Sequence, residues 1–280
     1  MSDNEVTISA SIVVHNPNIQ ILNKVILSLK NSFFRLSQAM PAKLNLYIVD
    51  NSSNINKEED LMGAIHRNAQ YLDNFQISLI NSSTNVGYGG GNNLAIERSK
   101  DKYFLVLNPD VFLDESVLME SIPFMEANEK YGLLSPSVFG ENGERHYLCK
   151  KNPTLFVLFL RSFAPQILKK IFSDRLSSYE MRERDYSQPM ENISYLTGCF
   201  MLFRKAVLDK INGFDERYFM YLEDADISRE VLKVSRTIYF PSAKITHLWE
   251  RGSHKKWKLR FISIISSLKY SLKWFCKGKT

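Results

Sequence analysis

Carboxylate side chains gather at two places in this chain where they could bind a cation or accept a proton. Glu223, Asp224 and Asp226 follow an aromatic segment and precede a segment of helical character. Asp110 stands just beyond the apolar run 103–107, at the end of a predicted strand. A strand-end carboxylate can ligate Mg²⁺ or Mn²⁺ together with substrate phosphates, and a carboxylate held near a hydroxyl can act as a general base. Two acidic sites of this kind predict an enzyme cleft.

Each of these motifs also has a purely structural interpretation. Asn108-Pro109-Asp110 is ordinary turn chemistry after a strand, and acids at 223–226 would stabilise a helix start by about 0.3 to 1 kcal/mol each. Asp50 could cap the helix that follows it, and His247 could be a hydrogen-bonded histidine at a strand end. The glycine-rich residues 85–93 could form a flexible turn. Taken one by one, the motifs leave both interpretations open.

Apolar runs alternate with segments of helical spacing through the first 110 residues. Strands are predicted at 8–14, 44–49, 75–80 and 103–107, and helices at 19–34, 61–71 and 94–99. This order predicts an α/β fold with a mostly parallel sheet flanked by helices, in which ligands bind outside the carboxyl ends of the strands. Asp50, Asn85 and Asp110 all fall at such ends.

The glycines within 87–91 precede a predicted helix and allow a phosphate or sugar to approach the backbone closely. The segment is neither Gly-x-Gly-x-x-Gly nor a Walker loop, so neither a dinucleotide fold nor a P-loop is indicated. Farther along, the pattern predicts helical structure within 150–186, strands at 195–203 and 238–245, and a short helix at 204–211 that closes at Gly213.

At 280 residues and 44% hydrophobic content, the chain can bury a large core. Cys149, Cys199 and Cys276 fit no metal spacing and are odd in number, which indicates a reducing compartment rather than a disulfide framework. The polar, acidic start lacks the pattern of a secretory signal, and no uncharged apolar run approaches the roughly 20 residues needed to span a bilayer. We therefore expect a cytoplasmic protein that does not cross the membrane.

The positive net charge of +6 comes from residues 251–280, which hold nine Lys and Arg and no acid. Apolar residues recur there at helical spacing, namely Trp257, Phe261, Ile264, Ile265, Leu268, Leu272 and Phe275. The segment is thus predicted to be a basic amphipathic helix. It could pack on the domain with solvated lysines. Alternatively it could lie among the headgroups of an anionic membrane, where each nearby Lys or Arg contributes about 1 kcal/mol.

Of these two placements we expect the second, in which residues 254–280 bind an anionic membrane surface. Nucleic-acid binding is not expected. No recognition motif accompanies the basic residues, and the apolar face of the helix would remain uncovered.

Eight short motifs occur one after another between residues 8 and 250. They are Ile12-Val13-Val14-His15-Asn16, Val49-Asp50-Asn51-Ser52-Ser53, Asn85-Val86-Gly87-Tyr88-Gly89, Leu107-Asn108-Pro109-Asp110, Thr197-Gly198-Cys199-Phe200-Met201, Gly213-Phe214-Asp215-Glu216, Phe219-Met220-Tyr221-Leu222-Glu223-Asp224 and His247. Together they resemble the inverting GT-A glycosyltransferases of family two, especially the bacterial rhamnosyltransferase-like branch. The resemblance implies a GT-A (nucleotide-diphospho-sugar transferase) fold over 1–250, with a nucleotide-binding half at 1–110 and an acceptor and catalytic half at 111–250. The basic amphipathic helix would follow at 251–280.

The resemblance also implies a role for each matching residue. The nucleotide would be held by Val14, His15, Asn16, Asp50, Asn85, Gly87 and Asn108, and the sugar or acceptor by Thr197, Gly198 and Glu223. Asp110 would be the metal-binding end of the family's Asp-x-Asp motif, in which Asn108 replaces the first Asp. His247 would complete the shell of a bound Mg²⁺ or Mn²⁺, and Asp224 matches the catalytic base. The usual Arg-Arg pair after that base is Arg229-Glu230 here.

The resemblance implies that the chain is an inverting glycosyltransferase. The leading donor would be dTDP-L-rhamnose, with UDP-galactofuranose, a UDP-hexose or a UDP-N-acetylhexosamine as alternatives, because few side chains set sugar specificity. The acceptor would be a polyprenyl diphosphate-linked saccharide, used for a bacterial surface polysaccharide such as O-antigen or cell wall at the inner face of the cell membrane. A non-catalytic nucleotide-sugar-binding membrane scaffold is the alternative of another class, which the intact Asp224 disfavours.

Overall fold

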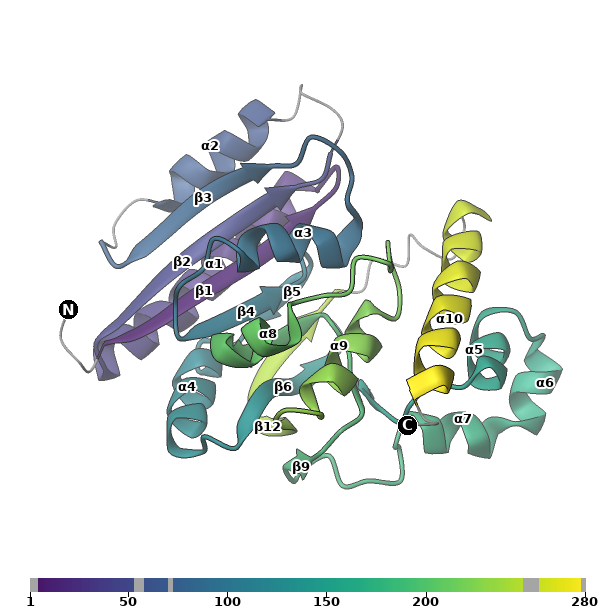
Figure 1. Ribbon diagram of the computed structural model, residues 1–280. Coiled ribbons are helices and arrows are strands. Elements are labelled where there is room, and N and C mark those ends of the chain that lie inside the picture. Colours follow the sequence, from purple (N-terminus) through teal and green to yellow (C-terminus); the bar gives the residue numbers. More distant parts are fainter. Residues whose placement is uncertain (1–4, 53–57, 70–72, 249–256, 278–280) are drawn as a thin grey trace.

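The computed structural model describes residues 5–52, 58–69, 73–248 and 257–277. Within these residues, ten strands form one sheet, and helices cover both of its faces (Figure 1). The sheet order is β3 (Phe75–Asn81), β2 (Ala42–Asp50), β1 (Val6–Val14), β4 (Tyr103–Leu107), β11 (Phe200–Arg204), β6 (Tyr131–Phe139), β12 (Arg236–His247) and β5 (Val111–Leu113), with β7 (Arg145–His146) beside β6 and β9 (Met190–Glu191) beside β12. A separate two-stranded sheet pairs β8 (Cys149–Lys150) with β10 (Tyr195–Leu196).

The strands from β3 to β4 are parallel, and the register places Val14 of β1 opposite Asp50 of β2. β11 then runs antiparallel between β4 and β6, whereas β12 is parallel to β6. β1 and β4 are buried along almost their whole length, because helices cover the sheet on both sides and apolar runs suit both faces. The carboxyl ends of β1, β2, β3 and β4 therefore meet at one edge, where ligands bind in such sheets.

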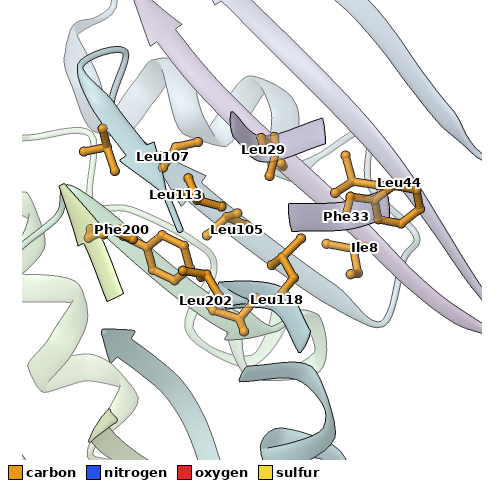
Figure 2. Close-up of a cluster of buried hydrophobic side chains, with 14 of the residues drawn as sticks. Ile8, Leu29, Phe33, Leu44, Leu105, Leu107, Leu113, Leu118, Phe200 and Leu202 are labelled. Atoms are coloured by element: carbon orange, nitrogen blue, oxygen red, sulfur yellow. The ribbon is translucent and has the colours of Figure 1, made fainter. Parts of the chain in front are cut away.

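The helices α1 (Ile19–Ala39), α2 (Glu58–Ala69) and α4 (Val117–Ala127) cover one face of the sheet. The first begins where the Asn18 side chain accepts hydrogen bonds from two backbone N–H groups of the first turn. Figure 2 shows Leu29 and Phe33 of α1 in the same cluster as Leu105 of β4 and Leu118 of α4. Burying each such side chain contributes about 1.5 to 3 kcal/mol, so this cluster is a main source of stability.

The helices α3 (Gly87–Ile96), α8 (Lys205–Ile211) and α9 (Glu223–Val231) cover the opposite face. Buried side chains of all three, such as Ile96, Leu208 and Ile227, pack with residues of β4, β6 and β11. A third group of helices stands beside the sheet: α5 (Leu155–Ser162), α6 (Gln166–Ile171), α7 (Ser173–Tyr179) and α10 (Trp257–Lys277) (Figure 1). None of the helices in the described ranges is long and apolar enough to span a bilayer.

The predicted α/β architecture and the strand–helix alternation of the first 110 residues are confirmed. Three details differ. The glycine segment is not a loop, because α3 already begins at Gly87. The strand predicted at 195–203 is two strands, β10 and β11, with a turn at 197–199 between them. Helix α4 and strand β6 lie in a region for which no element was predicted.

The two predicted halves, 1–110 and 111–250, both contribute strands to the one large sheet. The predicted boundary at residue 250 falls among residues 249–256, outside the described part of the chain, as do residues 278–280 of the basic segment. The helix predicted for that segment is α10.

Candidate active site

A cavity of about 370 Å³ opens at the carboxyl edge of the sheet. Its lining comes from the ends of β1 and β4, the start of α3 and Met220, which precedes α9. The lining residues that the sequence pointed to are Val14, His15, Asn16, Asn85, Gly87, Asn108 and Asp110. Residues from three motifs that lie far apart in the chain thus meet at one cavity, as the topological rule for parallel sheets predicts.

Asp50 is the predicted nucleotide-binding residue that does not line this cavity. Its side chain is buried, and its Oδ1 accepts a hydrogen bond from the backbone N–H of Ser52 at 2.7 Å, the geometry of an Asx turn. The neighbouring Asn51 lines the cavity instead. Asn51 is buried, and its Nδ2 donates to the carbonyl of Gly87 at 2.8 Å. It therefore joins the end of β2 to the start of α3.

The backbone at the cavity adopts conformations that require particular residues. Gly87 has a φ of +80°, and a Cβ there would overlap the carbonyl group of Phe219. A Cβ at Gly91 would lie 2.7 Å from Cγ1 of Val13, a separation that real Cβ atoms do not show. Glycine at these positions lets α3 lie directly against β1 and against the segment that precedes α9. Gly87 thus allows backbone to approach backbone, and Gly91 makes room for the side chain of Val13.

A carboxylate and an imidazole face each other at the predicted metal site. Asp110 Oδ1 lies 3.2 Å from His247 Nε2, because β5 pairs antiparallel with β12 just beyond Asp110. Burial alone would lower the pKa of His247, but its hydrogen bonds and charge interactions with Asp110 and Cys199 outweigh burial and raise that pKa to about 10.

Asp110 and His247 together offer a divalent cation two protein ligands. A carboxylate oxygen and an imidazole nitrogen are both common ligands of divalent metals. Among the described residues, no group of three or more His, Cys, Asp and Glu side chains could hold a metal ion. A site with two protein ligands suits a cation that takes its remaining ligands from a substrate diphosphate, as Mg²⁺ commonly does.

Asn108 does not present a free oxygen toward this pair. Its Oδ1 lies 2.8 Å from the hydroxyl of Tyr88, and the same hydroxyl lies 2.8 Å from the carbonyl oxygen of Gly198. The single proton of that hydroxyl is therefore shared between two acceptors. An amide suits this position because it accepts the hydrogen bond without a negative charge.

Asp224 lies at the first turn of α9 and is held by three donors. Its Oδ2 accepts hydrogen bonds from the Gly198 backbone N–H at 3.0 Å and from the Tyr195 hydroxyl at 3.2 Å. Its Oδ1 accepts from the backbone N–H of Ala225 at 2.9 Å. Two consecutive residues before the helix, Tyr221 and Leu222, have positive φ angles of 71° and 68°. Such conformations are costly for non-glycine residues and cluster at functional sites.

The surroundings of Asp224 keep its proton affinity high. Burial raises the pKa of Asp224, although the charge of Lys150 and the hydrogen bonds oppose this. Burial also raises the pKa of the adjacent Glu223, and the charge of Asp224 raises it further. Lys150 is itself buried, with its Nζ 3.2 Å from Thr197 Oγ1 and 4.6 Å from the ring centre of Tyr195. A carboxylate with a raised pKa is suited to general base catalysis.

The structure brings the two acidic sites to the same region through one chain of contacts. Gly198 donates to Asp224 with its N–H and accepts from Tyr88 with its carbonyl, and Tyr88 reaches Asn108, two residues from Asp110. Asp224 itself does not line the cavity, whereas Tyr88 does. Of the predicted acceptor residues, Gly198 donates to Asp224, Thr197 precedes Gly198 in the chain, and Glu223 precedes Asp224 at the start of α9.

Sequence reasoning missed four residues of this site: Asn51, Tyr88, Lys150 and Tyr195. Asn51 and Tyr88 belong to the quoted motifs, and the position of Tyr88 one residue after Gly87 is a signal that could have identified it. Lys150 and Tyr195 meet only because β8 pairs with β10. That pairing joins residues 45 positions apart through two-residue strands, so no local pattern reveals it.

Several known proteins are similar to this chain in sequence. Residues 9–212 match the family model described as "Glycosyl transferase family 2". The chain is 30% identical over 171 residues to "Rhamnosyltransferase WbbL" of Escherichia coli (strain K12). That alignment covers 58% of this chain and 60% of that protein. It is 25% identical over 183 residues to the "N-acetylglucosaminyl-diphospho-decaprenol L-rhamnosyltransferase" of Mycobacterium tuberculosis (strain ATCC 25618 / H37Rv), covering 61% of this chain and 58% of that protein. The chain thus aligns with less than two thirds of the length of these relatives.

Solved structures share the fold at lower identity. The mannosyltransferase PcManGT from Pyrobaculum calidifontis, in complex with GDP-Man and Mn²⁺, has a TM-score of 0.61 at 13% identity, covering 95% of this chain and 64% of that chain. Residues 1–349 of S. aureus TarS in complex with UDP have a TM-score of 0.55 at 14% identity, covering 86% of this chain and 60% of that one. The predicted GT-A fold is confirmed by these similarities and by the family match.

Proposed function

Because the chain belongs to glycosyl transferase family 2, we propose that it transfers a sugar from a nucleotide diphosphate donor to a hydroxyl group with inversion at the anomeric carbon. One observation carries this proposal: the Tyr88 hydroxyl contacts both Asn108, two residues before Asp110, and Gly198, whose N–H donates to Asp224. A diphosphate site beside the Asp110–His247 pair and an acceptor site beside Asp224 would place the reacting sugar between them.

Asp224 is the residue proposed to accept the proton. The acceptor hydroxyl loses its proton to the carboxylate while its oxygen bonds to the anomeric carbon. The bond from that carbon to the diphosphate breaks, and its electron pair leaves with the nucleoside diphosphate. Hydrogen bonds from Gly198, Tyr195 and Ala225 orient the carboxylate. One positioned base is sufficient for a single displacement, which inverts the configuration, whereas retention by double displacement needs a second carboxylate across the sugar.

We propose that Asp110 and His247 hold Mg²⁺ or Mn²⁺ when the donor is bound. Such a cation would offset the charge that develops on the leaving diphosphate. The cavity residues His15, Asn16 and Asn85 would contact the nucleoside part of the donor, since they lie at the strand ends beside this pair. The structural neighbour from Pyrobaculum calidifontis, which contains Mn²⁺ and GDP-Man, supports this arrangement by analogy of fold.

The donor proposed first is dTDP-L-rhamnose, because both curated relatives described above are named as rhamnosyltransferases. Another nucleotide sugar, such as UDP-galactofuranose, a UDP-hexose or a UDP-N-acetylhexosamine, is the alternative within the same chemistry. The acceptor proposed is a saccharide linked to a polyprenyl diphosphate, as the name of the mycobacterial relative states for that protein. The enzyme would then work on the cytoplasmic face of the cell membrane, in the assembly of a surface polysaccharide.

The decisive experiment compares donors and variants in one assay. The full chain is incubated with each nucleotide sugar, Mg²⁺ or Mn²⁺, and a lipid-linked acceptor, and release of nucleoside diphosphate is measured. Asp224→Asn is compared with Asp209→Asn, which changes an exposed carboxylate of α8. We expect turnover with one donor, a loss of roughly 10²- to 10⁴-fold in the Asp224 variant, as typical for a general base, and no change in the control.

Binding measurements separate loss of chemistry from loss of substrate. Calorimetry with the nucleoside diphosphate should show equal affinity for the native chain and for Asp224→Asn, because this residue does not line the donor cavity. Equal turnover by both proteins would remove Asp224 from its proposed role. Donor binding with no transfer by the native chain to any acceptor would support the non-catalytic scaffold instead.

A further inference from the structure

Exposed apolar side chains are concentrated on three helices beside the sheet. In the part of the chain that the structure describes, 17 large hydrophobic side chains are exposed, and 13 of them belong to α5, α6, α10 or Phe163 at the end of α5. We propose that α5, α6 and α10 form one docking face for an anionic lipid bilayer. This docking face adds a membrane partner to the proposed function. Its use by a lipid-linked acceptor rests on that proposed function.

The two parts of this docking face come from segments a hundred residues apart that lie side by side. Figure 1 shows α10, in yellow, next to α5 and α7, and α10 contacts α5 directly. Val157 of α5 and Tyr270 of α10 are buried in the same cluster, together with Tyr195 and Ala225 of the candidate active site. The helices are thus fixed on their inner sides by packing.

The outer sides of the same helices are apolar where a soluble surface is normally polar. On α5, Phe156 and Phe159 are 39% and 48% exposed, and on α6, Ile167 is 74% exposed. On α10, Phe261 and Leu272 are 65% and 67% exposed. Exposed apolar side chains concentrated on neighbouring helices in this way mark a site that binds another molecule or a membrane.

The positive charges of the Lys and Arg side chains on this face favour an anionic partner. Helices α5, α6 and α10 contain no Asp or Glu, whereas Lys170, Lys258 and Arg260 are exposed on them. A recess of about 460 Å³ next to α5 and α6 is lined by Arg161, Lys169 and Arg182 together with Glu180. Basic side chains around an apolar surface suit a bilayer whose headgroups are negative, since each nearby Lys or Arg contributes about 1 kcal/mol of attraction.

A second copy of the chain fits this face less well. A two-fold dimer would bring the same surface patch of both copies together. Since the face holds basic residues and its helices have no acids, like charges would then oppose each other across the contact. A bilayer with anionic headgroups meets both the apolar and the basic side chains.

Docking through this face would bring the candidate base close to the membrane surface. Tyr270 of α10 accepts a hydrogen bond from Arg229 of α9 at 3.1 Å, and Trp274 Nε1 donates to Asp226 of α9 at 2.8 Å. The same helix α9 begins at Glu223, next to Asp224. The candidate base and the docking face are thus joined through α9, which places the carboxylate on the membrane side of the sheet in this proposal.

Sedimentation with vesicles tests the whole docking face. The full chain is mixed with vesicles of equimolar phosphatidylcholine and phosphatidylglycerol, or of phosphatidylcholine alone. One variant changes Phe159→Ser and Ile167→Ser, a second changes Phe261→Ser and Leu268→Ser, and a control changes Leu27→Ser and Phe34→Ser, which are 50% and 48% exposed on α1. We expect each docking variant to lower the partition coefficient for anionic vesicles roughly tenfold or more, equivalent to about 1.4 kcal/mol, and the control to leave it unchanged.

The possible outcomes decide between one face, one helix and no membrane contact. If the α5–α6 variant sediments as the native chain does, the joint face is wrong, even if the α10 variant fails to bind. If all four proteins bind the vesicles equally, or if none binds, the bilayer is not the partner. The same holds if sedimentation velocity shows that both docking variants only convert a dimer into a monomer. Binding of nucleoside diphosphate and transfer to a water-soluble acceptor report on the proposed function separately, and neither docking variant should change them.

Discussion

Replacing Lys273 by methionine is expected to destabilise the fold by about 3 kcal/mol, because the change leaves a buried carboxylate without its countercharge. The Lys273 Nζ lies 2.6 Å from Asp226 Oδ2, 2.9 Å from Asp215 Oδ2 and 3.1 Å from Glu230 Oε1. The side chains of Lys273 and Asp226 are 7% and 1% exposed. This group of charges joins α10 to α9 and to the loop that follows α8.

The magnitude follows from what the variant leaves behind. Removing one partner of a buried ion pair costs about 3 to 5 kcal/mol. Asp226 keeps the hydrogen bond from Trp274, and Asp215 keeps its contacts with Arg217, so the loss should fall at the lower end of that range. Lysine and methionine have similar length, and the contacts of the aliphatic stem are therefore largely kept.

The pH dependence of the loss identifies its cause. Burial raises the pKa of Asp226, and Lys273 opposes that rise in the native chain. Without Lys273, the folded-state pKa of Asp226 rises further above its unfolded value. An acid shifted in this direction destabilises the fold increasingly as pH rises through the folded pKa, and the cost disappears as pH falls below the unfolded pKa. The deficit should therefore be larger at about pH 8 than at about pH 5.

Urea unfolding followed by tryptophan fluorescence measures the effect. The matched control is Lys269→Met, one turn earlier on α10, whose Nζ donates to the carbonyl of Arg217 from an exposed position. It should cost less than about 1 kcal/mol. Adding Asp226→Asn to Lys273→Met should recover part of the loss, since it removes the unpaired charge. A Lys273 variant no less stable than the Lys269 variant, or a deficit independent of pH, would refute this account of how α10 is held.

Three further predictions concern the candidate active site. Gly87→Ala should lower the melting temperature far more than Gly143→Ala, because both glycines have positive φ but only at Gly87 would a Cβ overlap the Phe219 backbone, while nothing lies within 4 Å at Gly143; similar melting temperatures would contradict the close approach. Tyr88→Phe should reduce kcat roughly tenfold, since the lost hydroxyl joins Asn108 to Gly198 and one such hydrogen bond is worth about 1 to 2 kcal/mol, whereas a Tyr147→Phe control should leave kcat unchanged. Lys150→Met should move the acid limb of the kcat/KM profile to higher pH, because activity requires ionised Asp224 and the charge of Lys150 opposes the rise in the pKa of that base; a limb that stays in place would show that Lys150 does not act on it.

The order of elements and the strand-end residues could be predicted because their signals are local. Buried strands such as β1 and β4 appear as continuous apolar runs, and the parallel topology then brings their carboxyl ends together. The placement of His15, Asn85 and Asp110 around one cavity follows from that rule alone. The antiparallel strand β11 could not be located within the sheet, because the order of strands depends on contacts between distant segments.

The contacts around Asp224 were less predictable for the same reason. Lys150 approaches Tyr195 through a pairing of two very short strands, and no periodic pattern marks elements of two residues. The role of Lys273 was also hidden. By composition it was one of nine basic residues of a predicted amphipathic helix, with its lysines expected either in solvent or among anionic headgroups, and only three-dimensional packing shows that it is buried among three acids.

The acidic residues Asp224 and Asp226 of α9 make contacts in two different parts of the structure. Asp224 and Asp226 are two residues apart on α9, which places their side chains about 200° apart around the helix axis. Asp224 accepts hydrogen bonds from Gly198 and Tyr195, on the side of the active site, and Asp226 binds Lys273 and Trp274 of α10. Since little more than half a helical turn separates the candidate base from the residue that binds α10, loosening α10 should disturb the base. We therefore expect Lys273→Met to lower kcat at neutral pH in the folded protein, where Lys269→Met leaves it unchanged, and equal kcat values would show that Asp224 and Asp226 act independently.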